Sequence, residues 1–437
     1  MSTLSIIGVI LGLAVLVYGS MKGFSVFISA ICGSVVMALF SGLSLNDAIL
    51  GSFVDGLVGF IKGNFMVFAA GALMGKVYEI TFGAKAVARL FVKLFSKKFA
   101  PFAVLVAIWV MTWGGIAGFV LAFSVFPIAL EVFREADLPR SIIPGVVICG
   151  CCCASSWGPG VAQPVNNIMA TGFGVSLMAA PVPSIIMAAA SCIFSCLMMG
   201  VIFKRARANG EHFVANEKDI TDDVTNLPNG VVALLPIIVA LILINVKVGE
   251  KTLMPTAFGI FTGAVLGYIL MFKFRNEKAP ITNHIGSAFG TALTSIGNTG
   301  AMVAVGSVAK ATAGFTLALD SVTGMGGSPV VSAAIAAMIM SFICGGATGA
   351  TGLLAPILAP IYTGMGANLA MVGRIVNAAG HVGGLMPNGG FVNTVITGIA
   401  NDTYKNCFKY TLIIATLSNL FAVIVGIIVM SIMGVYI

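Results

Sequence analysis

Apolar runs long enough to cross a membrane constrain the fold of this chain more than any other feature of its sequence. The clearest are residues 4–20, 24–41, 57–80, 178–203, 230–247, 254–272, 286–309 and 410–435. Charged residues make up 9% of the chain, against roughly 25% in soluble domains, so a water-soluble fold has too little interior to bury these runs. Because lipid offers no hydrogen-bond partners to the backbone, each run is predicted to be a helix. The predicted fold class is therefore an all-α polytopic membrane protein.

The basic residues predict how the chain lies in the membrane. Most of the Lys and Arg residues fall in loops that are cytoplasmic if the N-terminus is outside and each half crosses the membrane five times. Positive charge is retained on the cytoplasmic side, so we expect a bacterial-type inner-membrane protein with both termini outside. Met1–Gly19 lacks a basic leader region, which favours a retained first span over a cleaved signal peptide.

Two apolar regions, 99–172 and 328–405, are interrupted by Gly, Pro, Ser and Asn. In each, a half-length apolar run leads to a glycine-rich tip, Gly114–Gly118 or Gly345–Gly349, and another half-length run follows. This pattern predicts re-entrant helical hairpins over 99–133 and 328–363. Further breaks are predicted at 155–160 and 384–390. Irregular backbone at membrane depth is tolerated only where protein buries it or where it lines a water-filled site.

The same features recur in both halves of the chain. Gly63-Asn64 corresponds to Gly297-Asn298, the hairpin tips correspond to each other, and Trp157–Gly160 corresponds to Leu385–Asn388. Internal symmetry with interrupted helices at matching positions is typical of secondary transporters. The predicted parts are a first five-span repeat at 1–203, a cytoplasmic linker at 204–229 and an inverted second repeat at 230–437.

The interrupted segments are where a transported solute is expected to bind. Half-helix N-termini carry partial positive charge and free N–H groups, so they favour anions. For any single Gly or Ser, helix packing is the simpler explanation; for the paired breaks together, we favour a binding site. The predicted substrate-binding residues are Gly114, Gly115, Ser155, Ser156, Gly158, Gln163, Asn166, Asn167, Gly345, Gly346, Thr348, Thr351, Pro387, Asn388 and Asn393.

Three polar residues share one helical face that leads to the second break. Arg374, Asn377 and His381 have the spacing i, i+3 and i+7. Ionisable residues within spans are functional candidates, so these three are candidates for holding an anion or for ion coupling. An interfacial Arg and a hydrogen-bonded structural His are the alternative. The coupling ion is a proton or sodium, and no other cofactor and no metal is expected.

Several other functions are disfavoured by what the sequence lacks. The cluster Cys149–Cys153 has no zinc-site spacing and no nearby His, so packing is favoured over redox or metal chemistry. No G-x-x-x-x-G-K-[ST] motif supplies an ATP-driven motor, and no basic stripe interleaved with aromatics suggests nucleic acid. The spans carry almost no group that could serve an intramembrane enzyme.

A set of local motifs adds a family resemblance. The motifs are Phe126–Leu130, Glu135–Arg140, Ile143-Pro144-Gly145, Pro159-Gly160 with Gln163, Asn166-Asn167-Ile168, Ala179-Ala180-Pro181 and Pro387–Phe391. In these the chain resembles the gluconate permease family, the gluconate:proton symporters, within the ion transporter superfamily of elevator-type carriers. The resemblance implies an elevator motion, a homodimer held by scaffold spans and a sugar-acid substrate.

The chain departs from the family pattern at three places. Met386 stands where the family usually has His, Gly389 stands where an acid follows, and the first hairpin tip lacks the usual Pro and acidic residue. The function expected is cation-coupled uptake of a small organic anion, either gluconate or a short hydroxy acid. A sodium-coupled carrier of a di- or tricarboxylate such as citrate is the alternative, and an ion or anion channel is a weaker one.

Overall fold

The protein is helical almost throughout. The computed structural model describes residues 2–21, 24–95, 99–116, 118–217, 219, 226–248, 251–275, 280–314, 317, 328–387 and 389–436. Among these residues, β1 (Lys247–Val248) and β2 (Lys251–Thr252) are short strands that pair antiparallel. Six helical stretches among the described residues are long and apolar enough to cross a membrane. The chain therefore has the form of a multi-pass membrane protein.

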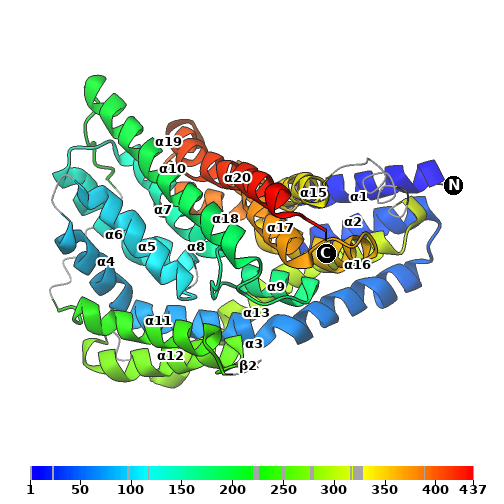
Figure 1. Ribbon diagram of the computed structural model, residues 1–437, viewed down its shortest axis with the longest axis horizontal. Coiled ribbons are helices and arrows are strands. Elements are labelled where there is room, and N and C mark those ends of the chain that lie inside the picture. Colours follow the sequence, from blue (N-terminus) through cyan, green and yellow to red (C-terminus); the bar gives the residue numbers. More distant parts are fainter. Residues whose placement is uncertain are drawn as a thin grey trace.

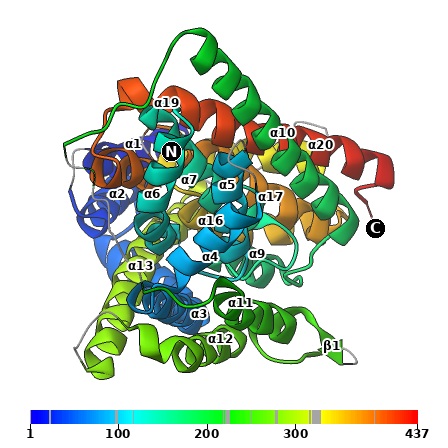
Figure 2. The same cartoon turned by 90° about the vertical axis from the view of Figure 1, so that its left-hand side faces the viewer.

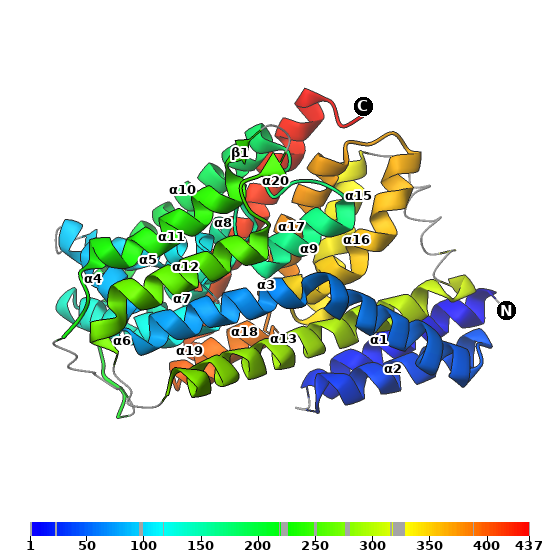
Figure 3. The same ribbon diagram turned by 90° about the horizontal axis from the view of Figure 1, so that it is seen from below.

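Long helices from both halves build one part of the molecule, which we call the frame. The continuous helix Asn46–Ile80, which contains α3, lies side by side with α13, and both run along the molecule (Figures 1 and 3). Their contact buries small residues such as Ala301, Ala304 and Val305. The frame helices are α1 (Ser2–Met21), α2 (Val26–Ser41), α3 (Val54–Ile80), α11 (Gly230–Asn245), α12 (Thr256–Met271) and α13 (Ile281–Lys310).

The remaining helices pack into a second part, which we call the bundle. Figure 2 shows α10 and α20 along the side of the molecule opposite α3, α11 and α12. α4 (Gly83–Leu94) lies between the two parts, because it contacts both α5 and α11. The other bundle helices are α5 (Ala100–Trp113), α6 (Gly118–Glu135), α7 (Ile143–Cys152), α8 (Ala154–Trp157), α9 (Pro164–Phe173), α10 (Pro181–Ala208), α15 (Pro329–Cys344), α16 (Ala347–Gly364), α17 (Leu369–Gly384), α18 (Gly390–Asn393), α19 (Tyr404–Thr411) and α20 (Leu417–Met433).

Both predicted hairpins are helical hairpins with glycine at the turn. α5 ends at Trp113 and α6 begins at Gly118, while α15 ends at Cys344 and α16 begins at Ala347. Gly115 has a φ of 94° and Gly345 a φ of 66°, a left-handed conformation that residues with a Cβ rarely adopt. The helices therefore end at these glycine-rich sequences because glycine adopts the left-handed backbone conformation that the turn requires.

Both predicted breaks interrupt a helical path. In the first half, α7 is followed by the single turn α8, and non-helical backbone runs from Gly158 to Gln163 before α9 begins at Pro164. Proline is favoured in the first turn of a helix because its missing N–H is not needed there. In the second half, α17 ends at Gly384 and α18 begins at Gly390, continuing as a π-helical segment, Thr394–Ile399.

Some helix ends differ from the sequence-based expectation. The helix that contains α3 begins at Asn46, well before residue 57, because its first turns carry polar residues that a hydropathy run does not include. α10 continues to Ala208, so the start of the predicted linker is helical. Five-span repeats, inversion and the side on which each end lies stay predictions.

Candidate functional site

Each hairpin tip lies against the break of its own half. Gln163 donates from Nε2 to the carbonyl oxygens of Thr112 (2.7 Å) and Ile116 (2.9 Å), and Ala162 N–H donates to Trp113 O at 3.1 Å. These bonds satisfy carbonyls of the last residues of α5 and of the turn that follows it, which have no partner within the helix. In the second half, Gly390 N–H donates to Gly345 O at 3.2 Å.

The glycines at the tips allow this close approach. A Cβ at Gly115 would lie 3.1 Å from the Cβ of Ala162, and one at Gly384 would lie 2.8 Å from Ala347 N. Gly114 packs on Ile237 of the frame, where a Cβ would lie 3.2 Å from the Ile237 Cβ. Gly346 lies against Gly384. Thr348, two residues after Gly346, is half-buried in the first turn of α16.

Arg374 is the central residue of the site. Its side chain is buried (0% exposed) and donates to the carbonyl oxygens of Trp157 and Gly158, the latter at 3.0 Å. It also donates to Leu177 O at 2.8 Å, to Ala179 O and to Asn166 Oδ1 at 2.8 Å. Among the described residues its hydrogen-bond partners include no carboxylate. Within the described part of the chain, dipoles alone therefore compensate this buried positive charge.

Asn377 and His381 connect the same helix to the first break. Asn377 Nδ2 donates to Asn166 Oδ1 at 3.2 Å, and His381 Nε2 lies 3.0 Å from Ser156 Oγ. His381 Nδ1 lies 2.9 Å from the carbonyl oxygen of Asn377, which can only accept, so Nδ1 carries a proton; in the neutral ring Nε2 then accepts from Ser156. Both ring nitrogens are thereby occupied, which favours the structural interpretation of His381.

Two buried polar atoms beside this cluster have no hydrogen-bond partner in the part of the chain that the structure describes. They are Asn377 Oδ1 and Thr351 Oγ1, and both side chains are 0% exposed. Thr351 lies on α16 opposite Gly380, one turn from Asn377 on α17. A buried unsatisfied polar atom costs roughly 1–3 kcal/mol, so this position is suited to a bound ion or water that would supply the missing partner.

Other predicted residues have structural roles or lie elsewhere. Ser155 Oγ donates to Gly150 O at 2.6 Å and so caps α7. Pro387 and Asn393 are exposed, and the carbonyl oxygen of Asn393 accepts from the Thr397 hydroxyl at 2.8 Å, one turn further along. The structure therefore does not bring Pro387 or Asn393 into the cluster. Asn388 lies outside the described residues.

Asn419 is a residue of this region that the sequence analysis missed. Its Oδ1 accepts from Trp157 Nε1 at 2.8 Å, and its Nδ2 donates to Cys152 O at 3.1 Å, next to the break between α7 and α8. In the sequence, Asn419 could have been found as a single amide side chain within the apolar run 410–435. The Cys149–Cys153 cluster lies at and just after the C-terminal end of α7, where Cys149 donates to Ser195 Oγ at 3.2 Å. No metal-binding group of His, Cys, Asp or Glu occurs among the described residues.

A cavity of about 490 Å³, which we call the chamber, lies between bundle and frame. Asn167 and Thr171 of α9 line its bundle side, together with the loop Ser176–Met178. α3, the end of α11 and the start of α12 line the frame side. Asn245 at the end of α11 donates to Gly160 O at 2.9 Å, so the frame touches the first break at the edge of the chamber. Among the predicted site residues that the structure describes, Asn167 is the one that lines the chamber.

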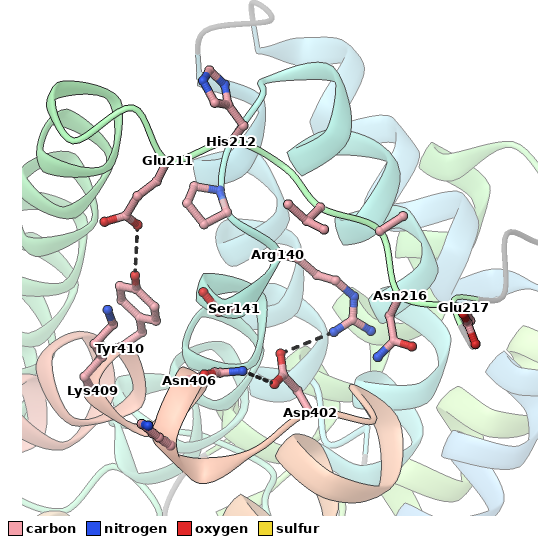
Figure 4. Close-up of a pocket in the computed structure, with 14 residues that line it drawn as sticks. Arg140, Ser141, Glu211, His212, Asn216, Glu217, Asp402, Asn406, Lys409 and Tyr410 are labelled. Atoms are coloured by element: carbon pink, nitrogen blue, oxygen red, sulfur yellow. Dashed lines mark hydrogen bonds and ion pairs between the residues drawn. The ribbon is translucent and has the colours of Figure 1, made fainter.

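A second cavity, the linker pocket, has a volume of about 790 Å³ and lies where the segment 211–217 crosses the bundle (Figure 4). Arg140 binds Asp219 through Nε and Nη2, donates to Ala400 O at 2.6 Å and lies 3.5 Å from Asp402. Burial acts to raise the pKa of Asp402, but hydrogen bonds from Thr403 and Asn406 outweigh it, so this pKa lies below its ordinary value. Because Arg140 pairs with Asp219 of the linker and with Asp402 of the bundle, the linker pocket has the features of an attachment point.

No protein-family model matches the chain. A Bacillus subtilis (strain 168) protein named "Uncharacterized transporter YxjC" is 25% identical, covering 94% of this chain and 96% of that protein. An "Uncharacterized transporter" of Haemophilus influenzae is 23% identical and covers 94% of each chain.

Two solved structures share the fold. The YdaH transporter of Alcanivorax borkumensis matches with a TM-score of 0.62 at 15% identity, over 89% of this chain and 90% of its own. MtrF of Neisseria gonorrhoeae, described with a class of antimetabolite efflux pumps, matches with a TM-score of 0.60 at 14% identity, over 89% and 85%. None of these four proteins is named as a gluconate permease, so that closer relationship stays a prediction. Together the comparisons identify a multi-pass membrane transporter and name no substrate for it.

Proposed function

We propose that the protein is a secondary active transporter that takes up a small organic acid anion by symport with a proton or sodium, as the resemblance to gluconate permeases implies. In this proposal it lies in a bacterial-type inner membrane with both termini outside. Its two inverted repeats each contribute a hairpin and a broken helix to a mobile bundle, and the frame holds a homodimer. Transport then consists of an elevator-like movement of the bundle against the frame.

The buried charge of Arg374 is the observation that carries the proposal. A guanidinium at 0% exposure whose described hydrogen-bond partners are carbonyl and amide oxygens creates a positive potential at the first break. Charges act over longer distances in a dry interior than in water, so this potential favours a negatively charged solute. Its hydrogen bonds also fix the carbonyls of Trp157 and Gly158, which orients the unwound backbone.

The unsatisfied oxygens of Asn377 and Thr351 support coupling to a cation. Amide, hydroxyl and backbone oxygens are ligands that hard cations accept, and irregular backbone in carriers supplies such ligands. Since both ring nitrogens of His381 are hydrogen bonded, sodium is as well supported as a proton.

The test is solute uptake into proteoliposomes. Gluconate, 3-hydroxybutyrate, lactate and citrate are each offered under an imposed proton or sodium gradient. We expect at least one anion to accumulate and to require one of the gradients. Asn167→Ala should lower uptake at least tenfold, while Asn209→Ala, an exposed amide at the end of α10, should leave it unchanged. The proposal is wrong if no organic anion accumulates above protein-free liposomes, or if flux is indifferent to both gradients.

A further inference from the structure

The side chains that line the chamber carry no charge. Its wall combines uncharged hydrogen-bonding groups with apolar ones, and it includes no acidic, basic or histidine side chain. Four of the polar side chains make no side-chain hydrogen bond to any residue in the described ranges, so they are available to a solute. They are Asn167, Thr171, Ser176 and Thr256.

One positive charge lies directly behind this wall. Leu177 lines the chamber, and its carbonyl oxygen accepts from Arg374 Nη2 at 2.8 Å. Arg374 therefore compensates one negative charge in the chamber. The wall offers no charge of its own to a second carboxylate, so a dicarboxylate would depend on the coupling cation for compensation.

Apolar side chains form the rest of the chamber. Met66 and Val67 come from α3, Met178 comes from the loop before α10, and Phe258 comes from α12. A polyhydroxylated chain would place several hydroxyl groups against this surface, and each would lose a water partner without gaining another. A short alkyl segment fits it without that cost.

From these three features we infer that the chamber selects a short monocarboxylate with one or two hydroxyl groups and an apolar end. The carboxylate lies toward the first break and Arg374, Asn167 and Thr256 bind the hydroxyl from opposite sides, and Phe258 contacts the alkyl end. Thr256 is thus a specificity residue contributed by the frame. This inference rests on the proposed function and narrows its substrate class.

The first test needs only the unmodified protein. Butyrate, 3-hydroxybutyrate, gluconate and succinate compete for uptake of whichever anion the protein accumulates. We expect 3-hydroxybutyrate to compete about tenfold better than each of the other three, since one hydrogen bond or one misplaced charge gives a factor of this size. Equal competition by butyrate, or better competition by gluconate or succinate, overturns the inference while leaving anion transport standing. If no anion is taken up at all, the proposed function itself fails.

The second test assigns the hydroxyl-binding residue. Thr256→Val keeps the side-chain shape and removes the hydroxyl, so it should reduce the preference for 3-hydroxybutyrate over butyrate about fivefold or more and leave butyrate competition unchanged. Thr262→Val is the matched control on the same helix, because its hydroxyl binds Phe258 O at 2.9 Å and does not line the chamber. An unchanged preference in Thr256→Val excludes Thr256. Should that variant not fold, Asn167→Ala, which removes the other hydroxyl-binding group, applies the same criterion from the bundle side.

Discussion

Single polar side chains complete the main-chain hydrogen bonding where the first half of this chain interrupts its helices. Arg374 binds carbonyls after α8, Gln163 binds carbonyls at the end of α5, and Asn419 binds the last carbonyl of α7. Buried carbonyl groups require such partners, and in lipid-covered protein water cannot replace them. The breaks therefore persist because distant residues stabilise them.

Arg140 attaches the linker to the bundle by binding Asp219, and its removal should release the linker. Its guanidinium is 7% exposed and binds Asp219, whose side chain is 4% exposed. Arg140→Ala leaves that carboxylate buried without its counter-charge, with the Asn216 N–H as its remaining donor at 2.9 Å, which costs about 3–5 kcal/mol. We expect faster proteolysis within 209–229 and a lower melting temperature, measured in detergent by mass spectrometry and thermal unfolding.

Arg205→Ala provides the control for that experiment, because this exposed arginine at the end of α10 has no ion pair among the described residues. Arg140→Lys should give an intermediate result, since lysine keeps the charge but cannot donate two parallel bonds. Equal proteolysis of the alanine variants at positions 140 and 205 would show that the linker is held by other contacts.

Asp137 should make the start of the linker sensitive to acid. Its carboxylate lies 2.6 Å from His212 Nδ1 and accepts from Phe213 N–H at 3.1 Å, and the bond to His212, followed by that to Phe213, lowers the pKa of Asp137. A lowered folded-state pKa means that this attachment is complete above the ordinary pKa of Asp, about 3.9, and is lost as the pH falls through the folded-state value. Hydrogen exchange of the Phe213 amide measures the loss of this attachment.

The Val231 amide is the internal reference for acid sensitivity, because it donates to the uncharged Asn229 Oδ1 at 2.9 Å. We expect the protection of Phe213 to fall relative to Val231 below about pH 4, and Asp137→Asn to abolish the difference. Parallel behaviour of both amides in the unmodified protein would argue against the carboxylate.

At the scale of elements, glycine determines how closely the hairpins approach the broken helices. A Cβ at Gly383 would collide with Met338 O and Ser341 Oγ and would lie 2.7 Å from Phe342 N, all on α15. Gly383→Ala should therefore separate α17 from α15, at a cost of about 1–3 kcal/mol, and should reduce uptake by displacing the second tip. Thermal unfolding and proteoliposome uptake measure the two effects.

Gly364→Ala is the matched substitution, since a Cβ near the end of α16 meets nothing within 4 Å. Alanine is the better helix former, so that variant should be unchanged or slightly stabilised. A Gly383→Ala protein as stable and active as Gly364→Ala would mean that the close approach is not required.

The sequence predicts the hairpins and breaks well because their causes are local. Gly115, Gly345 and Pro164 act on their own backbone, so composition alone places these helix ends within a few residues. The partners of Arg374 are not local: Trp157 and Leu177 lie about two hundred residues earlier in the chain, and backbone carbonyls carry no sequence signal. The chamber is less predictable still, since Thr256 and Phe258 of the frame resemble ordinary span residues.

At the scale of the whole molecule, the contacts separate into two kinds. Contacts within the frame join long helices along much of their length, as between α3 and α13 (Figure 3). Contacts between frame and bundle are made at tips and loops, as between Gly114 and Ile237 or Asn245 and Gly160, and also by the packing of α16 against α13, as between Gly352 and Val303. The proposed movement should occur at this boundary, because it is where the tip and the first break of the bundle meet the frame.

Disulfide cross-links should distinguish the two kinds of contact. Cβ atoms at Gly114 and Ile237 are 3.2 Å apart, and those at Gly56 and Ser307 are 2.7 Å apart, so small shifts bring either cysteine pair to disulfide distance. Oxidation of the pair G114C and I237C should abolish uptake by joining bundle to frame, and reduction should restore it. The pair G56C and S307C lies wholly within the frame and should stay active when oxidised. Normal uptake by fully cross-linked G114C and I237C protein would mean that the bundle does not move against the frame at this contact, because a covalent bond there would otherwise stop every transport cycle.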